Sequence, residues 1–338
     1  MKSKQSVMNS KQSVLIAHNY QLICQLRNMT NQSLGVLVLL SFLTLQLCFG
    51  SNAALAQEKV ITERSLTQQT TWYQRTQVSH QQLKDFIDDN KARIIDLEIS
   101  STKPLKLSAS LVKNTGKHAK QWWWYFDQTA QQVAEKLQQH KARLIDLDVY
   151  HDQGKLRYAI VMVANQGADA QAWWWFPSKT KRQLEAFIQQ EDARIVDIER
   201  YRHAGKTHFA AVLLKNTGAK KTDWWWYVGI TKKKLKHYLR ENKAQLLDFE
   251  SYRAADGVRY AAVMVPRKKG KKRVWFYTKS SRDELVDLGR RHGARLVDLE
   301  TPASGVSGYS GVFVNNGMIR DGHCGCLLYT SPSPRDRG

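Results

Sequence analysis

Two hydrophobic periodicities alternate along the chain between about residue 70 and residue 317. Apolar residues recur at helical spacing in short segments, such as Leu184, Phe187 and Ile188, and then form strand-like runs, such as residues 143–150 and 156–164. Each helical segment follows a Ser or Thr that predicts an N-cap, and in four of the five segments a Gln or Glu three residues later makes a capping box. The predicted caps are Ser79, Thr129, Thr180, Thr231 and Ser281. The pattern predicts five helices of about three turns, each followed by strands.

The same pattern returns every 50 or 51 residues. The segment Ala-Arg-Leu-Ile-Asp-Leu-Asp at 142–148 has counterparts at 92–98, 193–199, 244–250 and 294–300. A tryptophan block at 122–124 has counterparts at 173–175, 224–226 and, in degenerate form, 274–277. The central aspartates of the first segment and its counterparts are Asp96, Asp146, Asp197, Asp248 and Asp298. Such a period indicates a tandem repeat in which each unit packs against its neighbours.

We expect each unit to hold one helix and three antiparallel strands, with the tryptophan strand coming last, after an Asn-x-Gly turn. The fold class is therefore α+β, with repeats of about 50 residues in a curved or ring-like array, and propeller-like closure is compatible with the pattern. In the fifth unit Cys324 and Gly325 stand where a tryptophan strand is due. The pattern thus predicts a five-unit array over residues 71–317 whose fifth unit is incomplete.

Residues 1–56 have the features of a signal peptide. The apolar run 34–50 follows a segment with basic and no acidic residues, and the stretch Ala54-Leu55-Ala56 has the small-x-small form that a signal peptidase cuts. An uncleaved membrane anchor is the alternative, but the run is short for a span and contains three polar residues. A lipoprotein anchored at Cys48 is disfavoured because Leu47 precedes that cysteine. We expect a secreted or periplasmic protein with a mature N-terminal segment at 57–70 and no stable membrane span.

Residues 318–338 form an aberrant tail. From Cys326 onward this tail resembles the conceptual translation of a sequencing adapter. We therefore expect the natural sequence to differ from this one past about Gly317 and to continue beyond it.

The charge balance adds a class of partner. The chain has 52 Lys and Arg against 30 Asp and Glu, a formal net charge of +22, and few of these residues lie in the two terminal segments. The repeats are therefore basic, which favours anionic partners. No cysteine lies between residues 57 and 323, which excludes a disulfide scaffold, a thiolate metal site and a cysteine nucleophile from the repeats. The sequence contains no cofactor or metal motif, so we expect neither group.

The repeat motifs resemble those of a known family. The motifs are Ala-Arg-Leu-Ile-Asp-Leu-Asp at 142–148, Gly-Lys-Leu-Arg-Tyr-Ala at 154–159, the Asn-x-Gly turns, the tryptophan blocks and Thr-x-x-Gln-Leu at 180–184. They are similar to the bacterial tandem repeat family (type 1) found in the N-terminal region of polyglycine hydrolases and related secreted proteins. The resemblance covers roughly residues 70–317. It implies that a serine hydrolase domain resembling β-lactamases lies beyond the residues present.

The residues present lack the machinery of such a hydrolase. A β-lactamase-like site needs a Ser-x-x-Lys at the start of a helix together with a Lys-Thr-Gly strand. Ser178 and Lys181 open a helix, but their position is one of five equivalent helix starts, and Ser100 with Lys103 lies at a strand turn. No Lys-Thr-Gly occurs in the sequence. The sequence therefore predicts no catalytic site in the residues present.

Two sets of repeat residues admit both a structural and a functional interpretation. The middle tryptophans of the blocks, Trp123, Trp174 and Trp225, either fill the shared core or form a stacking platform for sugars. The five repeated aspartates, with Arg143 and its equivalents, either join adjacent units by a repeated hydrogen bond or ion pair, or form a ring of carboxylates that binds cations. We favour the structural interpretation of both sets.

The loops between the second strand and the tryptophan strand are basic in most units. Because equivalent loops of a repeat array share one rim, these loops would attract an anionic polymer, and the alternative is a merely solubilising surface. The candidate binding residues are Lys117, Lys120, Lys220, Lys221, Lys268, Lys269, Lys271, Lys272 and Arg273.

Two functions are compatible with these observations. The first is a secreted module that recognises a protein or polymer substrate for a hydrolase domain missing from this chain. The second is a free-standing extracellular adhesive or scaffolding protein whose repeats bind anionic or glycan polymers. An intracellular nucleic acid is not an expected partner, because the chain carries an export signal.

Overall fold

The computed structural model describes residues 70–116, 119–167, 170–267, 274–302 and 306–316. All of the described residues belong to one compact unit of the chain. No helix within the described ranges is long and apolar enough to cross a membrane.

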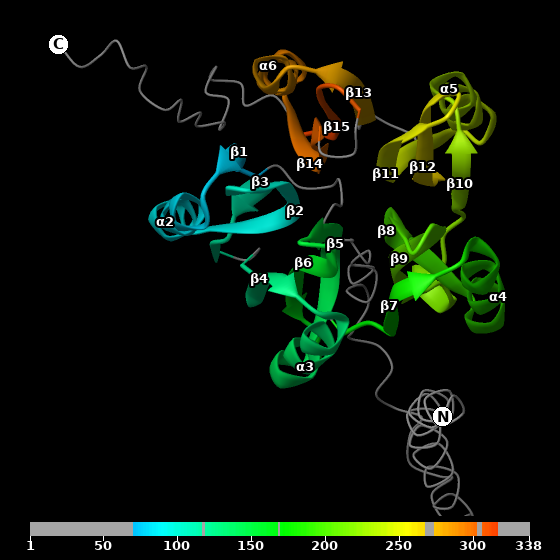
Figure 1. Cartoon of the computed structure of the whole chain (residues 1–338), viewed down its shortest axis with the longest axis horizontal. Coiled ribbons are helices and arrows are strands. Elements are labelled where there is room, and N and C mark those ends of the chain that lie inside the picture. The colour runs from blue at the N-terminus through cyan, green and yellow to red at the C-terminus, as the bar shows by residue number, and fades with distance from the viewer. Residues whose placement is uncertain (1–69, 117–118, 168–169, 268–273, 303–305, 317–338) are drawn as a thin grey trace, which may run out of the picture. The chain divides into compact units, whose positions relative to one another are not determined.

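The described residues form five copies of one element order, which we call blades: a strand, a helix and two further strands (Figure 1). Blade 1 comprises β1 (Trp72–Val78), α2 (His80–Asn90), β2 (Ala92–Thr102) and β3 (Leu105–Lys113). Blade 2 comprises β4 (Trp122–Gln128), α3 (Ala130–His140), β5 (Ala142–Asp152) and β6 (Lys155–Ala164). Blade 3 comprises β7 (Trp173–Lys179), α4 (Lys181–Glu191), β8 (Ala193–His203) and β9 (Lys206–Lys215), and the 3-10 turn η3 (Gly218–Lys220) follows it. Blade 4 comprises β10 (Trp225–Ile230), α5 (Lys232–Glu241), β11 (Ala244–Ala254) and β12 (Gly257–Pro266). Blade 5 comprises β13 (Val274–Ser280), α6 (Arg282–His292), β14 (Ala294–Glu300) and β15 (Tyr309–Asn315).

Each blade contains one antiparallel three-stranded sheet, with the last strand of the blade in the middle and the tryptophan strand at one edge. This confirms the predicted α+β repeat of one helix and three antiparallel strands. The predicted phase of the repeat is wrong, because β4 pairs with β6, which follows it in the chain, and not with the preceding β3. A period fixes the length of a unit but not the residue at which the unit begins. The fifth sheet, β13-β15-β14, therefore has its three strands, and the expectation of an incomplete fifth unit is wrong.

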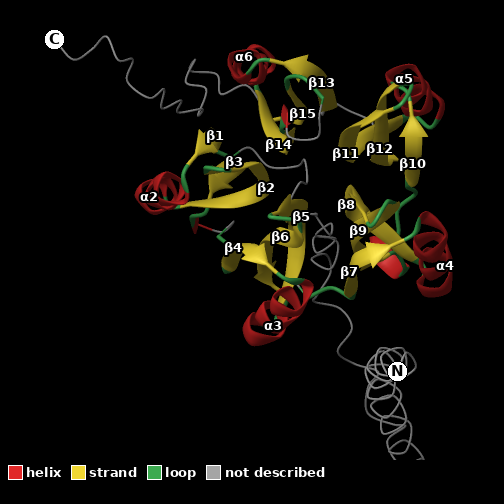
Figure 2. Cartoon of the chain, viewed as in Figure 1, coloured by secondary structure: helices red, strands yellow, loops and turns green. Residues whose placement is uncertain are grey.

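The helices begin and end as the sequence predicts. In α2, α3, α4 and α6 the N-cap hydroxyl accepts the N–H of the residue three positions on, and that residue's side chain accepts the N-cap N–H, which completes the capping box. In α5 Lys234 occupies the third position, so Thr231 caps the helix alone. Each helix lies beside its own sheet (Figure 2), and α3 buries Val133 and Leu137 against β5 and β6. An N-cap of this kind stabilises a helix by about 1 kcal/mol.

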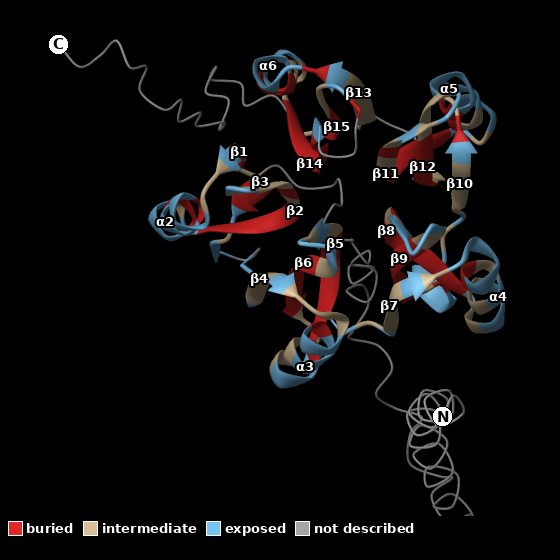
Figure 3. Cartoon of the chain, viewed as in Figure 1, coloured by how far each residue is buried: buried red, intermediate tan, exposed pale blue. Residues whose placement is uncertain are grey.

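The five sheets form a closed cycle. The third element of each blade, the inner strand, contacts the inner strand of the next blade, from β2 through β5, β8 and β11 to β14, and β14 contacts β2. Buried residues lie mainly on the middle and inner strands, while the helices expose much of their surface (Figure 3). The array therefore closes in the manner of a propeller, and neighbouring sheets share their apolar surfaces.

The junction between blade 5 and blade 1 copies the junctions through which the chain runs continuously. Between blades 1 and 2, the Asn114 side chain accepts the N–H of Lys120 at 2.8 Å and donates to its carbonyl at 2.9 Å. Between blades 5 and 1, Asn316 makes the same two bonds to Thr70, at 3.0 and 2.8 Å, although the two residues are 246 positions apart. The indole of Trp72 is buried at this junction and lies against Gly289 of α6.

Candidate functional site

The repeated aspartates lie where the inner strands meet. One carboxylate oxygen of each accepts a backbone N–H from the inner strand of the preceding blade. The five bonds join Leu97 to Asp146 at 2.8 Å, Leu147 to Asp197 at 3.0 Å, Ile198 to Asp248 at 2.9 Å, Phe249 to Asp298 at 3.2 Å and Leu299 to Asp96 at 3.0 Å. The last bond spans 203 positions and completes the cycle. All five aspartates are buried, so each bond satisfies a donor and an acceptor that water does not reach.

A second ring of carboxyl groups lies two residues further along the same strands. We call it the axial carboxyl ring; its members are Glu98, Asp148, Glu199, Glu250 and Glu300. Glu98 is within electrostatic range of Asp148 and Glu300 in the two adjacent blades, and Glu250 is within range of Glu98 across the cycle. Interactions between blades that are not neighbours place these groups around one common centre. Sequence reasoning missed this ring, although its members end each repeated motif.

The environment of the axial carboxyl ring favours the protonated form of its members. Burial raises the pKa of Glu98, Glu199, Glu250 and Glu300 well above the usual range, and the neighbouring carboxylates raise it further. Burial also raises the pKa of Asp148 to about 7, although the N–H of Ile99 donates to its carboxylate at 2.7 Å and opposes the shift. The carboxyl groups of Glu199 and Glu250 share a hydrogen bond, which requires a proton on one of them.

A bulge in each inner strand sets the face on which these charged residues lie. In β2 the register shifts between Ile94 and Asp96, so that Arg93, Asp96 and Glu98 are opposite alternate residues of β3 and share one face. The other blades repeat this arrangement, with the buried arginines Arg143, Arg194 and Arg295 at the first position and Gln245 in blade 4. The shared face of the five inner strands thus carries more carboxyl groups than guanidinium groups. No group of three or more His, Cys, Asp or Glu residues in the described ranges has a metal-binding arrangement.

The predicted basic loops lie at the end of the sheets where the tryptophan strands and inner strands begin. Of the predicted binding residues, Lys220 and Lys221 are exposed and Lys120 is half-buried. The predicted residues outside the described ranges are Lys117, Lys268, Lys269, Lys271, Lys272 and Arg273. The structure therefore gives a position to three members of the predicted rim.

The structure adds lysines from the helix ends to this rim. Lys91 and Lys141, and likewise Lys243 after α5, follow their helices with φ near +48°, and all three side chains are exposed. The carbonyl of Lys91 accepts the N–H of Asn114, the first residue of the adjoining loop, at 2.8 Å, and Lys243 accepts the N–H of Arg267 at 2.8 Å. Helix-end and loop cations are thus neighbours. We call the described members the basic rim: Lys91, Lys113, Lys120, Lys141, Lys215, Lys220, Lys221, Lys243 and Arg267.

The middle tryptophans of the blocks face the helix of their own blade. Trp123 stacks on His140 of α3 with ring centroids 4.3 Å apart, and Trp174 meets Phe187 of α4 edge-on at 5.3 Å. Trp225 is partly buried against the core that blades 4 and 5 share. Trp124 points the other way, toward His80 of blade 1 at 5.3 Å. The tryptophan blocks are therefore packed on both faces, as strand alternation requires.

Family comparison agrees with the repeat and with its phase. Residues 119–165 and 221–267 match the family model described as polyglycine hydrolase-like, structural repeat. The expected resemblance is confirmed. Each matched segment runs from just before a tryptophan strand to the end of the following middle strand, and so covers blade 2 or blade 4. A search of curated proteins found no match.

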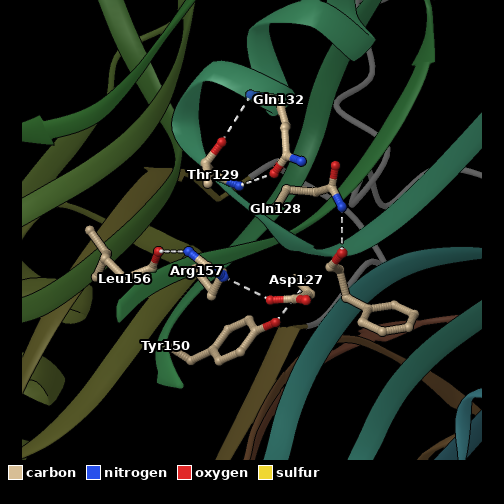
Figure 4. A network of polar contacts seen from close by, with 8 residues as sticks. Asp127, Gln128, Thr129, Gln132, Tyr150, Leu156 and Arg157 are labelled. Carbon is tan, nitrogen blue, oxygen red and sulfur yellow. Dashed lines mark hydrogen bonds and ion pairs between the residues drawn. The ribbon is translucent and has the colours of Figure 1, made fainter. Parts of the chain in front are cut away.

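The Ser-x-x-Lys of blade 3 is part of a clasp that has a counterpart in blade 2. In blade 2, Arg157 donates to the Asp127 carboxylate at 2.8 Å, and Asp127 donates its N–H to the Tyr150 hydroxyl (Figure 4). In blade 3 the equivalent residues are Ser178 and His208, with Oγ and Nδ1 2.8 Å apart.

The surroundings of that pair do not resemble a catalytic site. His208 lies against the rings of Tyr201 and His203, with centroids 5.7 and 6.4 Å away. A serine nucleophile needs a base that is itself oriented, commonly by a carboxylate, and neither ring supplies one. The pair serves the same purpose as the clasp of blade 2, which ties the end of the tryptophan strand to the start of the middle strand.

Proposed function

We propose that the cycle of five blades is the recognition module of a secreted protein and that it binds an anionic polymer along the basic rim. The carrying observation is that two separate elements, the helix ends and the adjoining loops, place exposed cations at the same end of the sheets. Blade 1 contributes the exposed Lys91 and Lys113, the loop after it contributes the half-buried Lys120, and the loop after blade 3 contributes the exposed Lys220 and Lys221. Several cations spaced along a rim suit a polymer with regularly spaced phosphate, sulfate or carboxylate groups better than they suit a small anion.

The backbone at the helix ends supports this proposal. A left-handed residue other than glycine costs roughly 1 kcal/mol, and Gly293 takes this position after α6. Lys91, Lys141 and Lys243 take it in three other blades, and Asp192 takes it in blade 3. A cation near a helix C-terminus gains about 0.3–1 kcal/mol from the helix dipole, which offsets part of the cost. We attribute the lysines at three of these five positions to a ligand at the rim.

Export is the second part of the proposal. It rests on the apolar run 34–50 and the cleavage motif that ends at Ala56, both in residues that the structure does not describe. Sequencing of the N-terminus of the protein recovered outside the cytoplasm should begin at Gln57. We further propose that the blades bind and do not catalyse, because the Ser178 and His208 pair is a strand clasp.

Binding and its salt dependence test the main proposal. Fluorescence anisotropy with labelled inorganic polyphosphate should show an affinity that falls steeply with NaCl, because each neutralised phosphate releases counterions. Replacing Lys91, Lys141, Lys220 and Lys221 by Gln should weaken binding and lower the slope of log K against log salt by roughly 0.7–0.9 for each phosphate that the variant no longer neutralises.

The matched control removes the same charge from the opposite end of the sheets, at Lys103, Lys155, Lys206 and Lys233, which are all exposed. This control should retain the wild-type slope. Equal loss of binding in both variants would contradict the proposal, because net charge and not the basic rim would then determine affinity.

A further inference from the structure

The cycle of blades has one junction that is not crossed by the chain. Between blades 5 and 1 the bonds are the Leu299 N–H to Asp96, at 3.0 Å, and the two bonds between Asn316 and Thr70. At the junctions between blades 1 and 2, 2 and 3, and 3 and 4, the chain itself adds a covalent link to the same pattern of bonds. Between blades 4 and 5, where Arg267 takes the place of the asparagine, the chain adds that link to the bond from the Phe249 N–H to Asp298. If the blades repel one another, the junction between blades 5 and 1 should therefore separate first, because it lacks a covalent link.

The interior of the cycle gathers carboxyl groups that repel one another when they are ionised. Each inner strand contributes an aspartate and a member of the axial carboxyl ring, while the guanidinium groups on the same faces come from Arg93, Arg143, Arg194 and Arg295, and Gln245 stands in blade 4. Among the described residues, the hydroxyl of Tyr150 also interacts with Asp148. Asp148 and Glu300 are buried and the other three members of the ring are half-buried. If all the carboxyl groups were ionised, like charges would therefore outnumber their counterions around one common centre.

We propose that ionisation of the axial carboxyl ring opens the cycle at the junction between blades 5 and 1, so that closure is sensitive to pH. Protonated members share hydrogen bonds, as Glu199 and Glu250 do, and stabilise the closed form. Ionised members repel one another across the centre. This conformational device is independent of the binding proposed for the basic rim.

The direction of the pH effect follows from the environment of the carboxyl groups. A carboxyl group whose pKa is higher in the folded protein than in the unfolded chain stabilises the fold below its ordinary pKa and loses that contribution as pH rises through the folded value. Burial and neighbouring carboxylates raise the pKa of Glu98, Glu199, Glu250 and Glu300, and that of Asp148 to about 7. The cycle is therefore most firmly closed in mild acid and loosens above neutral pH.

Amide hydrogen exchange at two equivalent positions tests the proposal. The Leu299 N–H donates to Asp96 across the junction between blades 5 and 1, which the chain does not cross. The Leu147 N–H donates to Asp197 across the junction between blades 2 and 3, which the chain does cross. Exchange is measured at pH 6 and pH 9 and expressed as protection relative to the unfolded peptide, which removes the intrinsic pH dependence. Protection at Leu299 should fall about tenfold more than protection at Leu147, which corresponds to a pKa shift of about one unit on one carboxyl group.

Neutral variants link the effect to the ring. The double variant Glu199→Gln with Glu250→Gln should reduce the extra loss of protection at Leu299. If the double variant folds poorly, Glu98→Gln alone serves the same purpose. The exposed control Glu135→Gln with Glu241→Gln should leave the extra loss unchanged. An equal fall at Leu299 and Leu147 would overturn the proposal, and so would an extra loss that persists in the ring variants.

Discussion

Each repeated aspartate uses one carboxylate oxygen to hold the backbone of the preceding blade, and the residue two positions further on is a second carboxyl group. The first role can be inferred from the sequence, because an acid repeated at one position of a tandem array indicates a contact between units. The axial carboxyl ring cannot be inferred in the same way. The sequence shows Glu98 and its equivalents at the ends of the motifs but does not show that strands from non-adjacent blades converge.

At the residue scale, the bond between blades can be tested at Asp146. Asp146→Ala should lower the free energy of unfolding by about 1–3 kcal/mol, because the buried Leu97 N–H then has no acceptor and a cavity remains. Asp146→Asn keeps an acceptor oxygen and should cost less. Urea denaturation of the two variants measures the difference, and equal stability of wild type and Asp146→Ala would show that the bond contributes nothing.

At the scale of elements, the helices and strands follow from local patterns, while the pairing of strands does not. The Ser and Thr caps and the apolar spacing locate all five helices. The tryptophan strand was expected to end a unit, but it begins one, because both neighbouring middle strands are close in sequence and periodicity alone does not choose between them. Trp72 and Tyr73 supply the first strand of blade 1. They are harder to recognise than the later tryptophan blocks because Gln74 follows them.

The contact between β1 and α6 gives a prediction at this scale. Gly289 occupies the helix position that is a buried leucine in α3 and α5, Leu137 and Leu239. A Cβ at Gly289 would lie 2.8 Å from the Trp72 indole, so Gly289→Leu should destabilise the protein by about 1–3 kcal/mol through overpacking.

Thermal or urea unfolding of a double-mutant cycle with Trp72→Ala separates this steric effect from a change in helix propensity. With the indole removed, the leucine should be tolerated, and the two substitutions together should cost clearly less than the sum of their separate costs. Strict additivity would contradict the packing of Trp72 against Gly289.

At the scale of the whole cycle, the number of blades and the closure depend on geometry that no single repeat contains. The sequence predicts an array of neighbours sharing a core, but the small rotation between adjacent sheets decides whether five blades close. The basic rim was likewise predicted in part, from its loops. The lysines at the helix ends were overlooked, although Lys91, Lys141 and Lys243 each stand directly before a repeated Ala, where a helix-ending glycine is common.

Closure is the central claim, and the Leu299 amide tests it most directly. Its hydrogen-exchange protection is compared in the wild type and in Asp96→Ala at one acidic pH. The control is the Leu97 amide in the wild type and in Asp146→Ala, at the junction between blades 1 and 2, which the chain crosses. A closed cycle predicts that Asp96→Ala lowers protection at Leu299, although the two residues are 203 positions apart, as strongly as Asp146→Ala lowers it at Leu97. An open array predicts that Asp96→Ala leaves the Leu299 amide unchanged, and that result would contradict the account.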